Sequence, residues 1–122
     1  MNSETLLLRQ IHPNFVQDGR PTSQAFRPTP KDENKLSVYN ETMIAAAASW
    51  YHYTEILNLE SAGVMALSHA EFVREQLNVI EDRDPFPEHC SVDFSGLKES
   101  EVKKKSKKLA SYAKVRGWLF QP

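Results

Sequence analysis

The sequence predicts a single small α+β domain over residues 1–122, with a short, mostly antiparallel sheet packed against about three helices. Short apolar runs at residues 5–11, 36–39 and 90–94 are bounded by turn-forming or charged residues, which is typical of strands. Residues 43–57 and 99–116 have helical composition and periodicity. The chain shows no internal repeat and no linker, so its strands and helices belong to one core.

Composition limits the possible classes. With 122 residues, 40% apolar and 25% charged, the chain has the balance of a globular domain, and its net charge is −1. No apolar run is long enough to cross a bilayer, and Glu4 precedes the first apolar run where a signal peptide would carry basic residues. Cys90 is the only cysteine, so an internal disulfide is excluded and we expect a cytoplasmic location.

The first third of the chain is expected to be extended. Residues 5–11 are predicted to form a strand, and Asp18 and Gly19 a turn. Prolines flank residues 23–27, which leaves a strand possible there but no helix. Residues 31–35 are a charged tip, so a hairpin between residues 23–27 and 36–39 is expected.

A helix is expected over residues 43–57, with Asn40 as its N-cap and alanines 45–48 as strong helix formers. Its buried face is predicted to contain Ile44, Ala47, Ala48, Tyr51 and Ile56. A short strand follows at residues 64–67.

The most specific local signal is the capping box at residues 68–71. Ser68 can accept a hydrogen bond from the backbone of Glu71, whose carboxylate can reach back to the backbone of Ser68. A short helix is therefore expected to end near Gln76. Its core residues are predicted to be Phe72, Val73 and Leu77.

The last third is expected to contain a strand or an extended segment at residues 78–82, a strand at 90–94 and a helix from about Glu99 to Arg116. Gly117 is suited to the left-handed position after that helix. The following Trp118, Leu119 and Phe120 are expected to pack back or to form a short edge strand.

Polar residues near the N-terminus form the predicted ligand site. If residues 6–8 and 25–26 belong to neighbouring core strands, an arginine fork lies beside hydroxyl groups, which suits a phosphate or carboxylate. The candidates are Arg9, His12, Arg20, Ser23 and Arg27. The alternative is a set of solvated loop residues with one arginine paired to a nearby aspartate.

Charge is divided along the chain. Residues 98–116 carry eight basic and two acidic residues, whereas residues 55–88 carry two basic and eight acidic ones. Lys104 and Lys108 are candidates for binding a protein partner, and the alternative is a solvated helix face. The lysines have no interleaved aromatic residues and one arginine at their end, so nucleic acid is not the expected partner.

No catalytic or metal-binding pattern is recognisable. The four histidines are dispersed, and no Cys-x-x-Cys or His-x-x-x-His spacing occurs, so we expect neither a metal nor a cofactor. His89 and Cys90 point to opposite faces of a strand, which argues against an activated thiol. No nucleophile and base that could act together are evident.

Several short segments carry a resemblance to known proteins. Leu7-Leu8-Arg9, Ile11-His12-Pro13, Gly19-Arg20, residues 23–28, Leu36-Ser37-Val38, Pro85 and Pro87-Glu88-His89 together resemble a group of small bacterial proteins of unknown function, over most of the chain. That resemblance implies no activity.

A more distant similarity is to ADP-ribosyltransferase-like toxins of the RES type. The order of Arg9, Gly19-Arg20, Ser23, residues 36–39 and a helix from Glu41 is similar to theirs, although this chain is shorter and only Glu55 approaches their acidic position. The similarity implies nicotinamide-nucleotide chemistry, with Arg9 and Arg20 holding phosphates.

Two functions follow as expectations. The first is a non-catalytic binding or accessory module of a bacterial multi-protein system, with a protein partner and no membrane or nucleic acid. The second is a small enzyme directed at NAD or another nucleotide, which requires Arg9 and Arg20 to converge in one pocket. Whether the chain is catalytic and how it oligomerises are left open.

Overall fold

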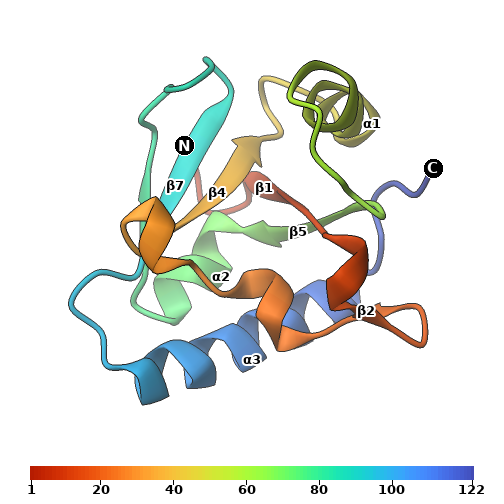
Figure 1. Ribbon diagram of the computed structural model, residues 1–122. Coiled ribbons are helices and arrows are strands. Elements are labelled where there is room, and N and C mark those ends of the chain that lie inside the picture. The colour runs from red at the N-terminus through yellow and green to blue at the C-terminus, as the bar shows by residue number, and fades with distance from the viewer.

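The computed structural model describes all 122 residues as one α+β domain built on a five-stranded antiparallel sheet in the order β5-β1-β4-β7-β6 (Figure 1). A separate two-stranded ribbon pairs β2 with β3. The strands are β1 (Leu6–Gln10), β2 (Val16–Gln17), β3 (Arg20–Pro21), β4 (Lys35–Asn40), β5 (Val64–Ser68), β6 (Asn78–Ile80) and β7 (His89–Asp93). The predicted fold class and the strands at residues 5–11, 36–39, 64–67 and 90–94 are confirmed.

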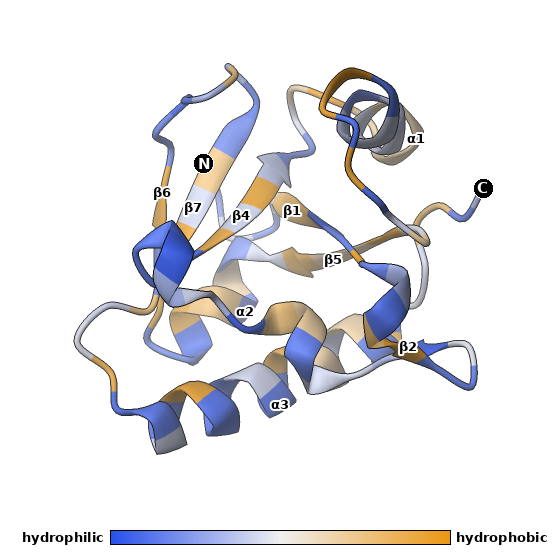
Figure 2. Cartoon of the chain, viewed as in Figure 1, coloured by the Kyte–Doolittle hydropathy of each residue, from blue (hydrophilic) through white to orange (hydrophobic).

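Helices cover both sides of the sheet. The helices are α1 (Ala46–Tyr51), continued by a π-helical turn at His52–Ile56, α2 (His69–Arg74) and α3 (Glu99–Arg116). The long helix α3 lies along one side of the sheet and α1 lies on the other (Figure 1). The surface of α3 that is turned away from the sheet is mostly hydrophilic (Figure 2). None of the helices has both the length and the apolar character needed to span a membrane.

Two hydrophobic clusters follow from the alternation of side chains along the strands. Leu7 belongs to a cluster of 16 buried residues between the sheet and α3. Leu8, the next residue, belongs to a cluster of four buried residues on the opposite face. Leu109, Ala110 and Ala113 bring α3 into the larger cluster, whereas Trp50 and Tyr53 pack α1 against the smaller one. The sheet is therefore buried on both faces along β1.

The capping box and the C-terminal helix form as predicted. Glu71 N donates to Ser68 Oγ over 3.2 Å, and Ser68 N donates to Glu71 Oε1 over 2.8 Å. Arg116, in the last turn of α3, donates to the same Glu71 carboxylate and to the carbonyl of Ala66. These contacts join α2, α3 and β5. Val73 is exposed, so its predicted place in the core is wrong, while Phe72 and Leu77 are buried.

The expected strand at residues 23–27 is wrong. Ser23–Phe26 form a 3₁₀ helix, and Phe26 O accepts a hydrogen bond from Ser106 of α3. The prolines on either side limit ladder pairing, and the apolar pair Ala25 and Phe26 is buried by packing against α3. The hairpin of the N-terminal region is instead β2–β3, whose turn is at Asp18 and Gly19 with positive φ at both residues, as an I′-type turn requires.

The predicted face of the alanine-rich helix is correct only for Ile44, which packs against the smaller cluster, whereas Ala47, Ala48, Tyr51 and Ile56 are exposed. Asn40 caps the turn at Thr42, and the helix begins at Ala46, later than expected. Tyr51 and Ile56 are 63% and 68% exposed, because the inward face is formed by Ala46, Trp50 and Tyr53. Large aromatic rings bury more apolar area than alanine, so they decide which side of this helix faces the sheet.

The strand pair at the centre of the sheet is short. β1 pairs with β5 over five positions and β4 pairs with β7 over five, but β1 and β4 share only Leu7 with Asn40 and Leu8 with Tyr39. Beyond Leu8 the two strands separate. This separation leaves the edge of β4 open in the middle of the domain.

The C-terminal residues return to the sheet as expected, with Phe120 bridging to Val64. We predict that Gly63→Ala is destabilising by about 2–3 kcal/mol, because an added Cβ would lie 2.6 Å from Phe120 O and 2.9 Å from the Trp118 ring. Urea unfolding at pH 7 measures this effect. Gly96→Ala is the control, since its φ is also positive but nothing lies within 4 Å of the added methyl. An equal decrease in the free energy of unfolding in the two variants would contradict the predicted steric contact at Gly63.

Candidate functional site

A cavity of about 410 Å³ lies where β1 and β4 separate. Five consecutive residues of β4, from Lys35 to Tyr39, line it. The side chains of Leu36 and Val38 are buried in the larger hydrophobic cluster, whereas those of Ser37 and Tyr39 project from the other face of β4, which β1 no longer pairs with beyond Leu8. The remaining lining comes from β1, the segment after Phe26, the end of the α1 region and the loop before β7. The first residue of β7, His89, also contributes. The lining outside β4 consists of Arg9, Gln10, Arg27, Pro28, Thr29, Asp32, Tyr53, Leu57, Leu59, Pro85, Phe86 and His89.

Arg9 bridges the gap between the separated strands. Its Nε donates to the carbonyl of Ala25 over 2.9 Å, and its Nη1 donates to the carbonyl of Ser37 over 3.0 Å. Burial lowers the pKa of Arg9, while Tyr53 and Asp32 act in the opposite direction. The guanidinium remains a cation at neutral pH. A fixed positive charge therefore stands in the cavity wall.

Arg27 follows the 3₁₀ helix Ser23–Phe26 and lines the same cavity. Its Nε is buried and has no acceptor within the protein. Leaving a buried donor without a partner costs on the order of 1–3 kcal/mol. Lys35 adds a third cationic side chain to the lining, against the single carboxylate of Asp32. The electrostatic balance of the cavity favours an anion.

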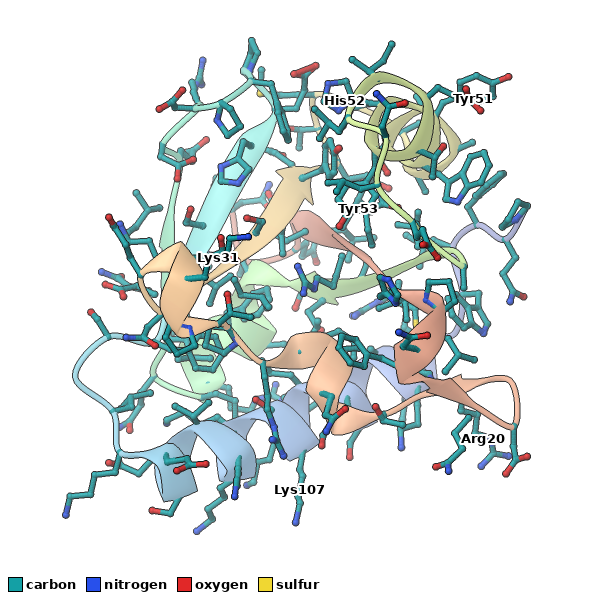
Figure 3. All side chains as sticks on the ribbon, viewed as in Figure 1. Arg20, Lys31, Tyr51, His52, Tyr53 and Lys107 are labelled. Carbon is teal, nitrogen blue, oxygen red and sulfur yellow. The ribbon has the colours of Figure 1, made fainter.

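Aromatic side chains form the opposite wall. Tyr39 and Phe86 are stacked, with ring centroids 4.9 Å apart. The Tyr39 hydroxyl and His52 Nδ1 are 2.8 Å apart. Burial, Tyr53 and Glu88 raise the pKa of Tyr39, so its hydroxyl keeps its proton. Figure 3 shows Tyr53 on the inner side of its helix and Tyr51 on the outer side.

A second polar group adjoins the cavity at His89, which is 7% exposed. His89 Nε2 is 3.1 Å from Ser37 Oγ, and His89 Nδ1 is 2.7 Å from Asp82 Oδ1. The other oxygen of Asp82 accepts from Ser91 Oγ. No nucleophile and base that could act together were recognisable in the sequence, and this contact between Ser37 and His89 was not predicted. The pair was missed because it joins strands about 50 residues apart in the sequence, and only their register brings it together.

Two of the five predicted ligand residues, Arg9 and Arg27, lie in the cavity. Arg20 lies on the β2–β3 ribbon in a separate depression with Trp118, away from Tyr53 (Figure 3). The predicted convergence of Arg9 and Arg20 is therefore wrong. His12 caps the turn before β2 by accepting from Asn14 N, and Ser23 opens a 3₁₀ helix, and neither lines the cavity. Arg20 belongs to the β2–β3 ribbon, in which it pairs with Gln17, and this ribbon lies outside the main sheet that contains β1. The order of residues in the sequence did not indicate this separation.

The two lysines predicted to bind a partner, Lys104 and Lys108, are both exposed on α3. They line a shallow depression together with Glu75, Glu101 and Lys105. Lys107 also points away from the domain (Figure 3).

Cys90 is buried in the larger hydrophobic cluster, on the face of β7 opposite to His89. Burial, followed by the charges of Glu81 and Asp82, raises its thiol pKa to about 11. The thiol is therefore protonated at neutral pH, in agreement with the packing role predicted for it. No three His, Cys, Asp or Glu side chains are grouped in a way that could hold a metal ion.

Comparisons with protein-family models, with curated proteins and with solved structures found no match to this chain. Functional inference therefore depends on the geometry of the cavity and of the surface.

The hydrogen bonds that Asp82 accepts from His89 and Ser91 can be tested in solution. Burial acts to raise its pKa, but hydrogen bonds from Ser91 and His89 outweigh burial and lower it. Its contribution to stability is therefore present above the unfolded pKa of about 3.9 and is lost as the pH falls through the folded pKa. We predict that Asp82→Asn costs about 1–2 kcal/mol at pH 7.

Urea unfolding of wild type and Asp82→Asn between pH 7 and pH 3.5 measures this difference, which should narrow on acidification. Asp84→Asn removes a nearby exposed carboxylate and should change little at either pH. A loss in Asp82→Asn that is independent of pH would show that the carboxylate charge is not the stabilising feature.

Proposed function

We propose that the chain binds a nucleotide, or a similar small molecule with an anionic group and a planar ring, in the cavity between β1 and β4. The observation that carries this proposal is the buried Arg27 Nε without an acceptor, in a wall that also contains Arg9. A phosphate or carboxylate oxygen would satisfy that donor. Arginine suits such groups because its planar fork can donate two parallel hydrogen bonds.

The size and the walls of the cavity fit this ligand class. Its volume of about 410 Å³ lies within the range of small-molecule sites, which is roughly 300–1,000 Å³. The lining contains the cationic side chains Arg9, Arg27 and Lys35 and the rings of Tyr39, Tyr53 and Phe86. Such a lining supports a ligand that carries both a phosphate and a planar ring.

The nucleotide-directed enzyme expected from the sequence required Arg9 and Arg20 in one pocket, and this requirement is not met. We therefore propose binding alone, at a different set of residues. Arg27 takes the place that the sequence assigned to Arg20, since Arg20 lies outside the cavity.

We predict that one of NAD, ATP and ADP-ribose raises the melting temperature of the protein. A ligand at 100 times its dissociation constant adds about 2.7 kcal/mol, which corresponds to a shift of several degrees for a domain of this size. Arg27→Ala should remove the shift, because it removes the unpaired donor and one positive charge. Differential scanning fluorimetry measures both.

Arg20→Ala is the matched control, because it removes the same charge outside the cavity and should keep the full shift. A panel without any shift, or an Arg27→Ala variant that shifts as wild type does, would reject nucleotide binding at this cavity.

A second candidate function is docking to an acidic surface of a protein partner in the bacterial cytoplasm, as a module of a multi-protein system. The observation that favours it is the uncovered face of α3, where Lys104 and Lys108 are exposed and share one depression. Lysines at such a surface guide association and set its salt dependence.

We predict that Lys104→Ala/Lys108→Ala weakens partner capture roughly tenfold at low salt, since each exposed ion pair contributes up to about 1 kcal/mol. Quantitative pull-down from the native cell measures capture, and circular dichroism checks that the fold is kept. Arg20→Ala/Lys31→Ala removes two exposed charges elsewhere and should capture normally (Figure 3). Unchanged capture by the α3 variant would eliminate this surface.

A further inference from the structure

Ser37, His89 and Asp82 form a continuous hydrogen-bonded chain that ends at the cavity. Ser37 Oγ lies 3.1 Å from His89 Nε2, and His89 Nδ1 lies 2.7 Å from Asp82 Oδ1. Ser37 and His89 both line the cavity, while Asp82, whose side chain is 30% exposed, contacts the other nitrogen of the imidazole from outside the cavity. Ser37 is exposed and His89 is buried, so the hydroxyl is accessible at the wall and the ring is fixed behind it.

The sheet register creates this arrangement. On β4 and β7, Ser37 lies opposite Ser91, and Tyr39 lies opposite His89. All four side chains therefore project from the same face, and Ser37 and His89 are diagonal neighbours across the two strands. Asp82 comes from the loop that joins β6 to β7, where Arg83 N donates to the carbonyl of His89. Three separate segments place three groups in line.

The proton positions follow from the partners. The Asp82 carboxylate accepts only, so His89 Nδ1 carries the hydrogen in that contact. In the neutral ring, Nε2 then has a free lone pair and accepts the hydrogen of Ser37 Oγ. The Ser91 hydroxyl donates to the second carboxylate oxygen and fixes its orientation. This is the tautomer in which a histidine can remove a proton from a serine.

We propose that Ser37 is the nucleophile of an ester hydrolysis, with His89 as general base and Asp82 as a positioning residue. The substrate class is a carboxylic ester that carries an anionic group, held by Arg27 and Lys35 in the same cavity. This inference rests on the anion-binding part of the proposed function, and it adds a reaction to it.

The steps balance without a cofactor. Ser37 Oγ attacks the ester carbonyl carbon while its proton passes to His89 Nε2. The carbon–oxygen bond to the alcohol then breaks, and His89 returns that proton to the leaving oxygen. Water attacks the acyl-serine with His89 again as base, which releases the carboxylic acid and restores the Ser37 hydroxyl. The net reaction is ester plus water to acid plus alcohol.

The first experiment uses a fluorophosphonate probe, which phosphonylates an activated serine and releases fluoride. Peptide mass spectrometry should find the adduct at Ser37 in wild type and none in Ser37→Ala. Ser111 is exposed on α3 away from any histidine contact and serves as an internal control that should stay unlabelled. Absence of an adduct, or labelling of Ser111 at the same rate, would overturn the proposal.

The second experiment tests the base. His89→Gln should slow labelling at least about 100-fold, since general-base assistance contributes 10² or more. Asp82→Asn should also slow it, because the amide disfavours the required tautomer, and Asp82→Glu should restore part of the rate. Circular dichroism shows which variants fold. Folded variants of His89 and Asp82 that label as fast as wild type would overturn the proposed relay.

The third experiment tests the substrate class. The anionic 4-nitrophenyl hemisuccinate ester should be hydrolysed with kcat/KM at least about tenfold above that for neutral 4-nitrophenyl acetate, and Arg27→Ala should remove this preference while Arg20→Ala keeps it. Equal rates for both esters would overturn the anionic class. Two measurements on the wild-type protein separate the hydrolase from nucleotide binding. A nucleotide-induced shift in melting temperature without fluorophosphonate labelling of Ser37 would overturn the hydrolase and leave nucleotide binding. Labelling of Ser37 without such a shift would support the hydrolase and reject nucleotide binding.

Discussion

The bridge made by Arg9 determines the shape of the centre of this domain. β1 and β4 pair at only two positions, and where they separate the Arg9 guanidinium donates to the carbonyls of Ser37 and Ala25. These two hydrogen bonds replace ladder contacts between the strands and also attach the 3₁₀ helix Ser23–Phe26 to the sheet. Arginine suits this position because its long side chain and several donors can span a gap that a neutral side chain would leave as unpaired backbone. The cavity is a consequence of that gap.

The two faces of the sheet differ in the side chains that they carry. On β4 and β7, Val38, Cys90 and Val92 contribute to the larger hydrophobic cluster. The alternate residues, Ser37, Tyr39, His89 and Ser91, form the polar chain and the aromatic wall. Strand alternation thus lets one pair of strands supply both a core and a site. The smaller cluster under α1 completes the second face, and it holds Tyr53 against the cavity.

Local signals in the sequence predicted the parts of the fold that depend on local physics. The Ser68–Glu71 capping box, the helix from Glu99 to Arg116 and the apolar strand runs needed only neighbouring residues to be recognised. The predictions for Ser23–Phe26 and for the buried face of α1 were wrong. The conformation of that segment and the orientation of that helix depend on packing against α3 and against the sheet. Of the site, Arg9 and Arg27 were predicted from their chemistry, whereas His89, Ser37 and Asp82 required the register of β4 with β7. Such long-range pairing leaves no trace in local composition.

Several features that cost stability are found together at the cavity between β1 and β4, although nearly all other buried polar side chains have hydrogen-bond partners. The only buried side-chain polar atoms without a partner are Thr22 Oγ1 and Arg27 Nε, and Arg27 lines the cavity. The same cavity exposes the edge of β4 in the middle of the sheet and gathers three cations around one carboxylate. Each feature costs stability, and a chain selected for packing alone would have little reason to keep them together, because apolar residues could fill the gap. Their coincidence with a hydrogen-bonded serine and histidine supports a ligand that compensates for these costs when it binds.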